Sequence, residues 1–286
     1  MTQLNPEAAK PAPRRSRAVE KEIELNAPVE AVWKALTDGK ELARWFPLEA
    51  RVKPGVGGEV FLSWGEWCQG TGKIDVWEPN KRLRWLEPLP GMSEQGAPAH
   101  LAVEWTLEAR GGKMILRLVN SGFSGASDWE NEYYDGTDYG WTFMLLSLKY
   151  ALEKHPGVAR QSIGPRHKFA GTREQAFERL VAPGGIFRQA FPAGVDAGSR
   201  YSLRSAATDD ALEGKIEFVR PPRGLCVSVE NLNNALLWAE IFGETGKVDT
   251  TLWLYTYGLP EAQHAALSSA WNRHYAAIFA DGKAAE

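Results

Sequence analysis

The residues best suited to chemistry surround one long helical stretch, residues 127–155, whose start is acidic. Its carboxylates are Asp128, Glu130, Glu132, Asp135 and Asp138. Negative charge near a helix N-terminus is favourable through the helix dipole alone, which explains most of this cluster structurally. Asp138 differs, because helical phase places it with Tyr134 on the same side as Trp141. A few polar groups beside aromatic side chains are what a small-molecule site uses to orient its ligand.

Other residue types that could support chemistry form no recognisable constellation. No histidine stands four residues from another or beside a cysteine; the five are His100, His155, His167, His264 and His274. Cys68 and Cys226 lack CxxC or Cys/His spacing, so the sequence predicts no metal site and no disulfide framework. Residues 55–58 lack the GxGxxG spacing and lead into a strand, which indicates a turn. We therefore expect no cofactor, and no acid/base pair is evident.

The stretch 127–155 is the longest helical pattern in a strand-rich region. Ser127 with Glu130 is typical of a capping box, and Pro156-Gly157 supplies the stop. One apolar stripe along it comprises Trp141, Met144, Leu145, Leu148 and Leu152. A second stripe, on nearly the opposite side, comprises Phe143, Leu146 and Tyr150. Since both stripes need cover, we expect a sheet on one side and a second partner on the other.

The chain of 286 residues is long for one domain and comfortable for two. Hydrophobic content of 44%, charged content of 24% and a net charge of −3 argue against a nucleic-acid partner. No window holds the roughly 18 apolar residues of a membrane span, and no secretory signal is evident, so the cytoplasm is the expected location. The twelve tryptophans stand out, since large aromatic side chains fill cores or line apolar pockets.

The first half of the chain predicts an α+β domain. Residues 1–18 are rich in Ala and Pro and lack apolar periodicity, so we expect a disordered tail. A strand from Val19 leads through Asn26-Ala27-Pro28 into a helix that ends near Leu36. Strand patterns follow in 59–64, 72–77, 82–87, 100–109 and 113–120. Their short polar turns indicate an antiparallel sheet that wraps the long helix, which gives a domain over 19–155.

Four runs within this domain resemble the helix-grip superfamily, which includes START domains and polyketide cyclases. The runs are VEKEIELNAPVEAVWKALTDGKELARWF, GEVFLSW, GTGKIDVWEPNKRLRWLEP and YGWTFMLLSLKYALE. The branch that they resemble is that of the activator-of-heat-shock-ATPase-homologue-like (AHSA-type) proteins, over roughly residues 19–155. The resemblance implies a cavity between the sheet and the long helix, roofed by the short helices. It implies little about activity, because fold and function are widely separated in such a superfamily.

The second half resembles a shortened repeat of the first. Segment pairs recur in order at shifts of 144, 142 and 130 residues: 169–180 with 25–36, 214–229 with 72–87, and Trp271 with Trp141. The predicted fold class is therefore α+β, with two tandem helix-grip domains, each a curved antiparallel sheet wrapped around a long C-terminal helix. The second domain is expected over 165–282 after a linker at 156–164, with the two long helices ending near Lys154 and Ala280.

The repeat offers the second partner that the long helix needs. If Phe143, Leu146 and Tyr150 face away from their own sheet, packing against the second domain hides them; a homodimer contact is the alternative. We expect the second domain to be mainly structural, with a smaller or closed cavity. It has only Ile186-Phe187 in place of the Trp45-Phe46-Pro47 cluster, and it lacks the long loops of the first domain.

The first domain is therefore the expected location of a ligand pocket. Its residues are Trp45 and Phe46 as the roof, Trp64 and Trp105 on the sheet, Trp141 on the helix, and Tyr134 and Asp138 at the polar end. We predict a cytoplasmic START-like protein that binds a hydrophobic or aromatic small molecule there, more a binding module than an enzyme. One alternative is a cyclase, dehydratase or hydrolase that acts on a hydrophobic substrate through Asp138 or another pocket carboxylate. The other is a chaperone-associated stress protein, with a chaperone as its partner.

Overall fold

The computed structural model describes residues 17–66, 68–88, 100–123 and 128–280. It contains two seven-stranded antiparallel sheets, each accompanied by helices, and confirms the predicted α+β fold class. Residues 1–16 of the expected disordered tail and Ser127 of the expected capping box lie outside the described residues. Arg17 and Ala18, also assigned to that tail, instead pair with Phe123 and Ser121 at the start of a strand.

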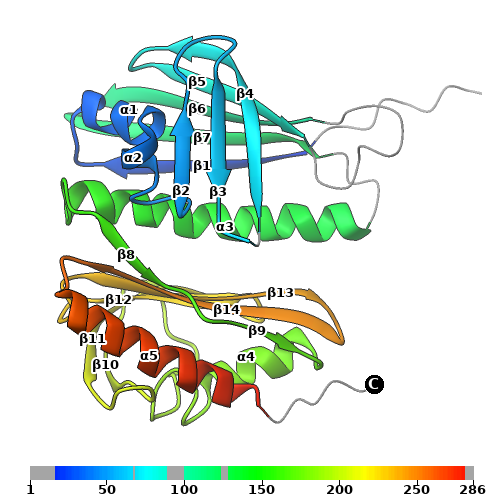
Figure 1. Cartoon of the computed structure of the whole chain (residues 1–286), viewed down its shortest axis with the longest axis vertical. Helices are drawn as coiled ribbons and strands as arrows, with labels where there is room; N and C mark the ends of the chain where they lie inside the picture. The colour runs from blue at the N-terminus through cyan, green and yellow to red at the C-terminus, as the bar shows by residue number, and fades with distance from the viewer. Residues whose placement is uncertain (1–16, 67, 89–99, 124–127, 281–286) are drawn as a thin grey trace, which may run out of the picture.

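The first domain is a sheet curved over one long helix (Figure 1). Its elements are β1 (Arg17–Leu25), α1 (Val29–Thr37), α2 (Gly39–Leu42), β2 (Glu49–Val52), β3 (Glu59–Ser63), β4 (Gln69–Glu78), β5 (Arg82–Pro88), β6 (His100–Arg110), β7 (Lys113–Phe123) and α3 (Asp128–Glu153). The strand order is β1-β7-β6-β5-β4-β3-β2. Alternate residues of β6 are buried, and this face meets α3 where Trp105 contacts Trp141.

The second domain repeats this arrangement with its own sheet and long helix. Its elements are β8 (Arg160–Ile163), β9 (Arg166–Phe169), α4 (Arg173–Val181), β10 (Arg200–Arg204), β11 (Ala211–Arg220), β12 (Gly224–Val229), β13 (Ala235–Glu244), β14 (Lys247–Tyr257) and α5 (Glu261–Ile278). Strands β10 to β14 lie in sequence order, and both β8 and β9 pair with β14. A capping box starts α4, because the Thr172 hydroxyl accepts from Gln175 N at 3.2 Å and the Gln175 side chain accepts from Thr172 N at 2.9 Å.

Several elements of the two domains have identical bounds after a constant shift in residue number. Helix α4 has the bounds of α1 shifted by 144 residues, and β11 has those of β4 shifted by 142. The bulge in β4 between Ile74 and Val76 recurs in β11 between Ile216 and Phe218. The segment after Gly171 is helical and the second sheet is antiparallel, which agrees with the predicted repeat.

The second domain departs from the first at its edges. Residues 160–280 contain no counterpart of α2 or β2, and an isolated bridge between Phe187 and Ser205 takes the place of that pairing. The strand equivalent to β1 is divided into β8 and β9 at Gly164-Pro165. Gly164 lies against the Trp253 ring, where a Cβ atom would collide, and Pro165 has no N–H to donate to a ladder. The strand is therefore divided because the Trp253 ring crowds the backbone at Gly164 and because Pro165 lacks the N–H that a continuous ladder needs.

Helix α3 lies between the two sheets, so both of its apolar stripes are covered (Figure 1). On the side of the second sheet, the Phe143 ring stacks on Trp238 with centroids 4.0 Å apart. Tyr150 Oη donates to Glu217 Oε1 at 2.6 Å. The predicted intramolecular contact of the second stripe is thus confirmed for Phe143 and Tyr150.

The second sheet is consequently buried on both faces. Trp238 and Tyr255 belong to the apolar core that they share with α3 and the first sheet, whereas Leu237 and Leu254 belong to the core under α4 and α5. All six residues of β12 are buried, in keeping with its nearly continuous apolar sequence. Alternation of side chains along each strand therefore divides one sheet between two cores.

Replacing Phe143 by Ala tests the shared core. Because the ring is fully buried and stacked on Trp238, the substitution should lower the free energy of unfolding by about 3–5 kcal/mol. Urea unfolding followed by circular dichroism measures the change. The control Val56→Ala, at a side chain that is 72% exposed, should change the value by less than about 0.5 kcal/mol. Small and equal effects of the two substitutions would show that the contact contributes little to folding.

Candidate functional site

Five of the seven predicted site residues meet in the interior of the first domain. Phe46 stacks on Trp141 with ring centroids 4.9 Å apart, and Trp64 meets Phe46 edge to face at 5.2 Å. Trp105 contacts Trp45 at 6.0 Å and Trp141 at 5.3 Å, also edge to face. The structure therefore brings the residues of the predicted roof, sheet and helix together.

These rings pack against one another and occupy the interior. Trp45 and Trp105 have no exposed surface, and Trp141 is 6% exposed. Trp45 Nε1 donates to the Ala35 carbonyl at 2.9 Å, and Trp141 Nε1 donates to Asn120 Oδ1 at 3.0 Å, which orients both rings. A ligand placed between this sheet and α3 would have to displace packed aromatic side chains.

Tyr134 lies away from this aromatic cluster. Its hydroxyl donates to the Ala18 carbonyl at 3.1 Å, and the Arg17 guanidinium lies 4.3 Å from its ring centroid. Phe123 meets the ring edge to face at 5.2 Å. Because Arg17 and Ala18 begin β1, Tyr134 holds the edge of the sheet against α3. The structure thus places Tyr134 apart from the aromatic cluster and in the lining of the cleft between the domains, and its predicted role in ligand binding stays a prediction.

Asp138 is also placed differently from the prediction. Its carboxylate forms ion pairs with Lys21 at 2.6 Å and with Arg220 of the second domain at 2.8 Å. Helix α3 stays regular through Gly136, so Asp138 is offset by about 60° from Trp141 around the helix axis. That offset turns the carboxylate to the edge of the helix, where cations of both domains reach it. Asp138 therefore does not face the aromatic cluster but lines the cleft between the domains, and its predicted role in ligand binding stays a prediction.

A second ion-pair group lies nearer the start of α3. Glu132 pairs with Arg173 at 2.7 Å and with Arg223 at 2.6 Å. Desolvation by burial acts to raise the pKa of the Glu132 carboxyl, but hydrogen bonds from Arg223 and Arg173 outweigh it and hold the pKa below its usual value. The pKa of Asp138 is lowered by the same balance, with Lys21 and Arg220 as donors. Because every carboxylate here has a cationic partner, these groups join the domains.

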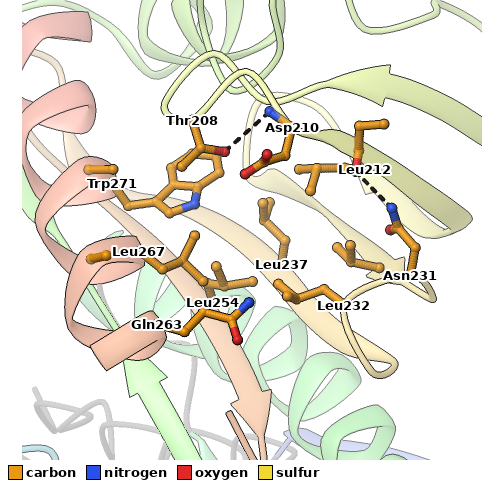
Figure 2. A pocket seen from close by; sticks show the side chains of 14 residues that line it. Thr208, Asp210, Leu212, Asn231, Leu232, Leu237, Leu254, Gln263, Leu267 and Trp271 are labelled. Atoms are coloured by element: carbon orange, nitrogen blue, oxygen red, sulfur yellow. Dashed lines mark hydrogen bonds between the residues drawn. The ribbon is translucent and has the colours of Figure 1, made fainter. Parts of the chain in front are cut away.

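The second domain contains a cavity of about 670 Å³ between α5 and its sheet (Figure 2). Val229, Leu237 and Leu254 line it from β12, β13 and β14. Leu237 and Leu254 are paired across neighbouring strands, so both side chains leave the sheet on the same face. Helix α5 contributes Leu267 and Trp271, which are four residues apart and so on one side of the helix. The cleft between the domains, beside Asp138, is smaller, at about 340 Å³.

Polar groups stand at the rim of the second-domain cavity. Thr208 and Asp210 precede β11, and the Asp210 N–H donates to Thr208 Oγ1 at 3.5 Å. Figure 2 shows the Asp210 carboxylate turned toward Trp271. Asn231 has a structural role, since its amide donates to the Ala211 carbonyl at 2.8 Å and accepts from a backbone N–H at 3.0 Å. The arrangement is an apolar interior with a few polar groups at its edge.

The prediction of a smaller or closed cavity in the second domain is wrong, and side-chain volume explains why. Strands β5 and β12 align at a shift of 142 residues, and the β6–β7 and β13–β14 hairpins align at 134. Trp85 therefore corresponds to Val227, and Trp105 corresponds to Ala239. Two indole rings are missing from the second interior. The exchange of Trp85 for Val227 is visible in the repeated sequence segments and is the signal that could have located the cavity.

Glu240 is a half-buried acid on the interface between the domains. It lies on β13 two residues after Trp238 and therefore on the face turned toward α3. Burial raises the pKa of the Glu240 carboxyl to about 7, although Arg223 and Arg166 act to lower it. The folded protein thus holds a proton near neutral pH that the unfolded chain releases.

The described parts of the chain hold no group of three or more His, Cys, Asp or Glu side chains placed to bind a metal ion. Among the helices that the structure describes, none is long and apolar enough to cross a membrane.

The fold and the aromatic interior define the first domain as a helix-grip domain. Residues 26–153, less than half of the chain, match the family model of Activator of Hsp90 ATPase homolog 1-like protein. The predicted AHSA-type resemblance is thereby confirmed. The match ends before the second domain, where the larger cavity lies.

The solved structures similar to this chain match either about half of it or nearly all of it. Protein MLL2253 from Mesorhizobium loti is 26% identical over 49% of this chain and 99% of its own, with a TM-score of 0.43. The Aha1 dimer from Colwellia psychrerythraea is 23% identical over the same shares, also at 0.43. DynU16, a protein of the dynemicin biosynthetic locus, is 17% identical over 93% of this chain and 99% of its own, at 0.41. No curated protein matches the chain.

Asp138→Asn should weaken the contact between the domains. The substitution removes the charge that Lys21 and Arg220 share, and we expect a loss of about 1 kcal/mol because the pairs are only partly buried. Urea unfolding at low and at high salt measures it, and the loss should shrink in high salt. The control Asp196→Asn changes net charge equally at an exposed position and should have no effect. Equal behaviour of the two variants would contradict an ionic contact.

Glu240 should make the folded state less stable as pH rises. Its folded pKa of about 7 exceeds the usual 4.5, so the stabilisation is present at about pH 5 and lost by about pH 8. We expect this group to lower the free energy of unfolding by about 1–3 kcal/mol over that range. Glu240→Gln, which stays neutral throughout, should remove this part of the decline in urea unfolding at the two pH values. An identical decline in the variant and the wild type would contradict the assignment.

Proposed function

We propose that the protein binds a small apolar or aromatic molecule in the second-domain cavity, between α5 and the sheet. The observation that carries this proposal is the cavity itself, about 670 Å³ in volume, with a floor of Val and Leu and with Trp271 in its wall. Sites for small molecules typically measure about 300–1,000 Å³ and combine apolar walls with a few polar groups. The position between a long helix and a curved sheet also agrees with the ligand cavity that a helix-grip fold implies.

The composition of the lining favours binding over catalysis. Among the described lining residues, Asp210 is the one titratable side chain. A cyclase, dehydratase or hydrolase would need acid and base groups within hydrogen-bond reach of the substrate. Asp138, the residue expected to serve that alternative, is held by Lys21 and Arg220. A cytoplasmic location, a chaperone partner and a homodimer stay predictions from the sequence.

Two tryptophan substitutions on α5 test the proposal. Ala270 lies in the cavity wall, so Ala270→Trp should fill part of the cavity and weaken binding of the uncharged fluorescent probe N-phenylnaphthylamine at least about tenfold. Ala276 is exposed on the same helix, so Ala276→Trp should leave the probe's Kd within about twofold of wild type. Fluorescence titration gives the three Kd values, and circular dichroism confirms that the variants fold.

A third variant separates the two domains. Trp64 belongs to the aromatic cluster of the first domain and is only half-buried, so Trp64→Ala should fold and bind the probe as the wild type does. If Trp64→Ala weakened binding and Ala270→Trp did not, the ligand would lie in the first domain and the proposal would fail. Equal binding by all variants would place the probe outside both interiors.

A further inference from the structure

The cavity of the second domain has at its rim one carboxylate, that of Asp210, with no direct ion-pair partner among the described residues. The neighbouring carboxylate of Asp209 is neutralised, because Arg188 and Arg204 both pair with it. Arg204 holds Asp209 through two hydrogen bonds of 3.0 and 2.8 Å, and Asp210 influences that guanidinium only as a weaker, more distant charge. In the described part of the chain, no side chain donates a hydrogen bond to the carboxylate of Asp210 or pairs with it.

The surroundings of Asp210 match those of a site for an ammonium group. Its carboxylate is turned toward the Trp271 ring across the cavity (Figure 2). A carboxylate beside an indole offers a cation both a counter-charge and the negative face of an aromatic ring. Between them and Gln263 at the far end lie apolar side chains such as Leu237.

The lining also disfavours acids. Within the described lining there is no Lys, Arg or His, so a ligand carboxylate would meet the Asp210 charge with no cation in the lining to pair with it. A neutral ligand would meet neither attraction nor repulsion. Among ligands of equal apolar size, the charge of Asp210 should therefore favour ammonium compounds, leave neutral compounds unaffected and disfavour carboxylates.

We propose that the cavity selects an aromatic or apolar molecule that carries a protonated amine, with the ammonium group against Asp210 and the apolar body between α5 and the sheet. This inference rests on the proposed function and names its ligand class. Asp210 is exposed at the rim, so its preference is modest, roughly three- to tenfold in affinity.

Competition against the uncharged probe N-phenylnaphthylamine tests the inference with three matched ligands: naphthylethylammonium, naphthylethanol and naphthylpropionate. With the wild-type protein, the ammonium compound should displace the probe at a roughly three- to tenfold lower concentration than the alcohol, and the propionate should be weakest. In Asp210→Asn, the ammonium and the alcohol should become equal competitors, with each inhibition constant calculated from the Kd that this variant shows for the probe. Asp210→Glu should keep the order, and Asp196→Asn, which removes a charge outside the cavity, should also keep it.

The outcomes separate this inference from the proposed function. If the wild type binds the probe but the three ligands compete equally, or if Asp210→Asn keeps the full ammonium preference, the inference is overturned and the small-molecule site stands. If Ala270→Trp leaves probe binding unchanged, or the wild type binds no probe, both are overturned. An ammonium preference that Asp210→Asn alone abolishes supports both.

Discussion

The structure depends on the burial of α3 on two sides. One long helix with two apolar stripes cannot be covered by a single curved sheet, and the Phe143–Trp238 stack shows where the second cover comes from. The same contact fixes what remains for the second domain: its sheet has one face against α3 and must use the other for α4 and α5. Two helix-grip units thus share one layer, and neither the position nor the orientation of the second sheet is independent of the first.

Side-chain volume decides which of the two domain interiors contains a cavity. The first interior is occupied by Trp45, Trp105 and Trp141 in mutual contact. At the position of Trp105 the second sheet has Ala239, and a cavity of about 670 Å³ lies beneath α5. The richer aromatic content of the first domain therefore indicates a filled core. In the second domain, smaller side chains leave room while Trp271 keeps an aromatic wall.

The acidic residues of α3 and of the cavity rim also differ, in whether they form ion pairs. The α3 acids Glu132 and Asp138 form ion pairs with arginines of the second domain and, for Asp138, also with Lys21, and these pairs join the domains. Asp210 has no such partner at the rim of the cavity, although the next residue along the chain, Asp209, has two. The acid that helical phase singled out forms ion pairs with both domains, and the acid at the rim of the cavity lies in a loop, where no helix or strand period applies.

The sequence by itself determined the elements, the helix-grip fold of the first half and its repetition in the second, because strand and helix periods and turn residues act over short distances. It also predicted that the second stripe of α3 needs cover, either from the second domain or from a homodimer contact. Tertiary structure alone decided which interior is empty and where Asp138 points. Which interior is empty depends on the summed volumes of side chains from distant strands, such as Val227 and Ala239. The direction of Asp138 depends on a rotation of about 60° around the axis of α3. The repeat shows the exchange of Trp85 for Val227, but the exchange of Trp105 for Ala239 and the direction of Asp138 depend on contacts between distant segments.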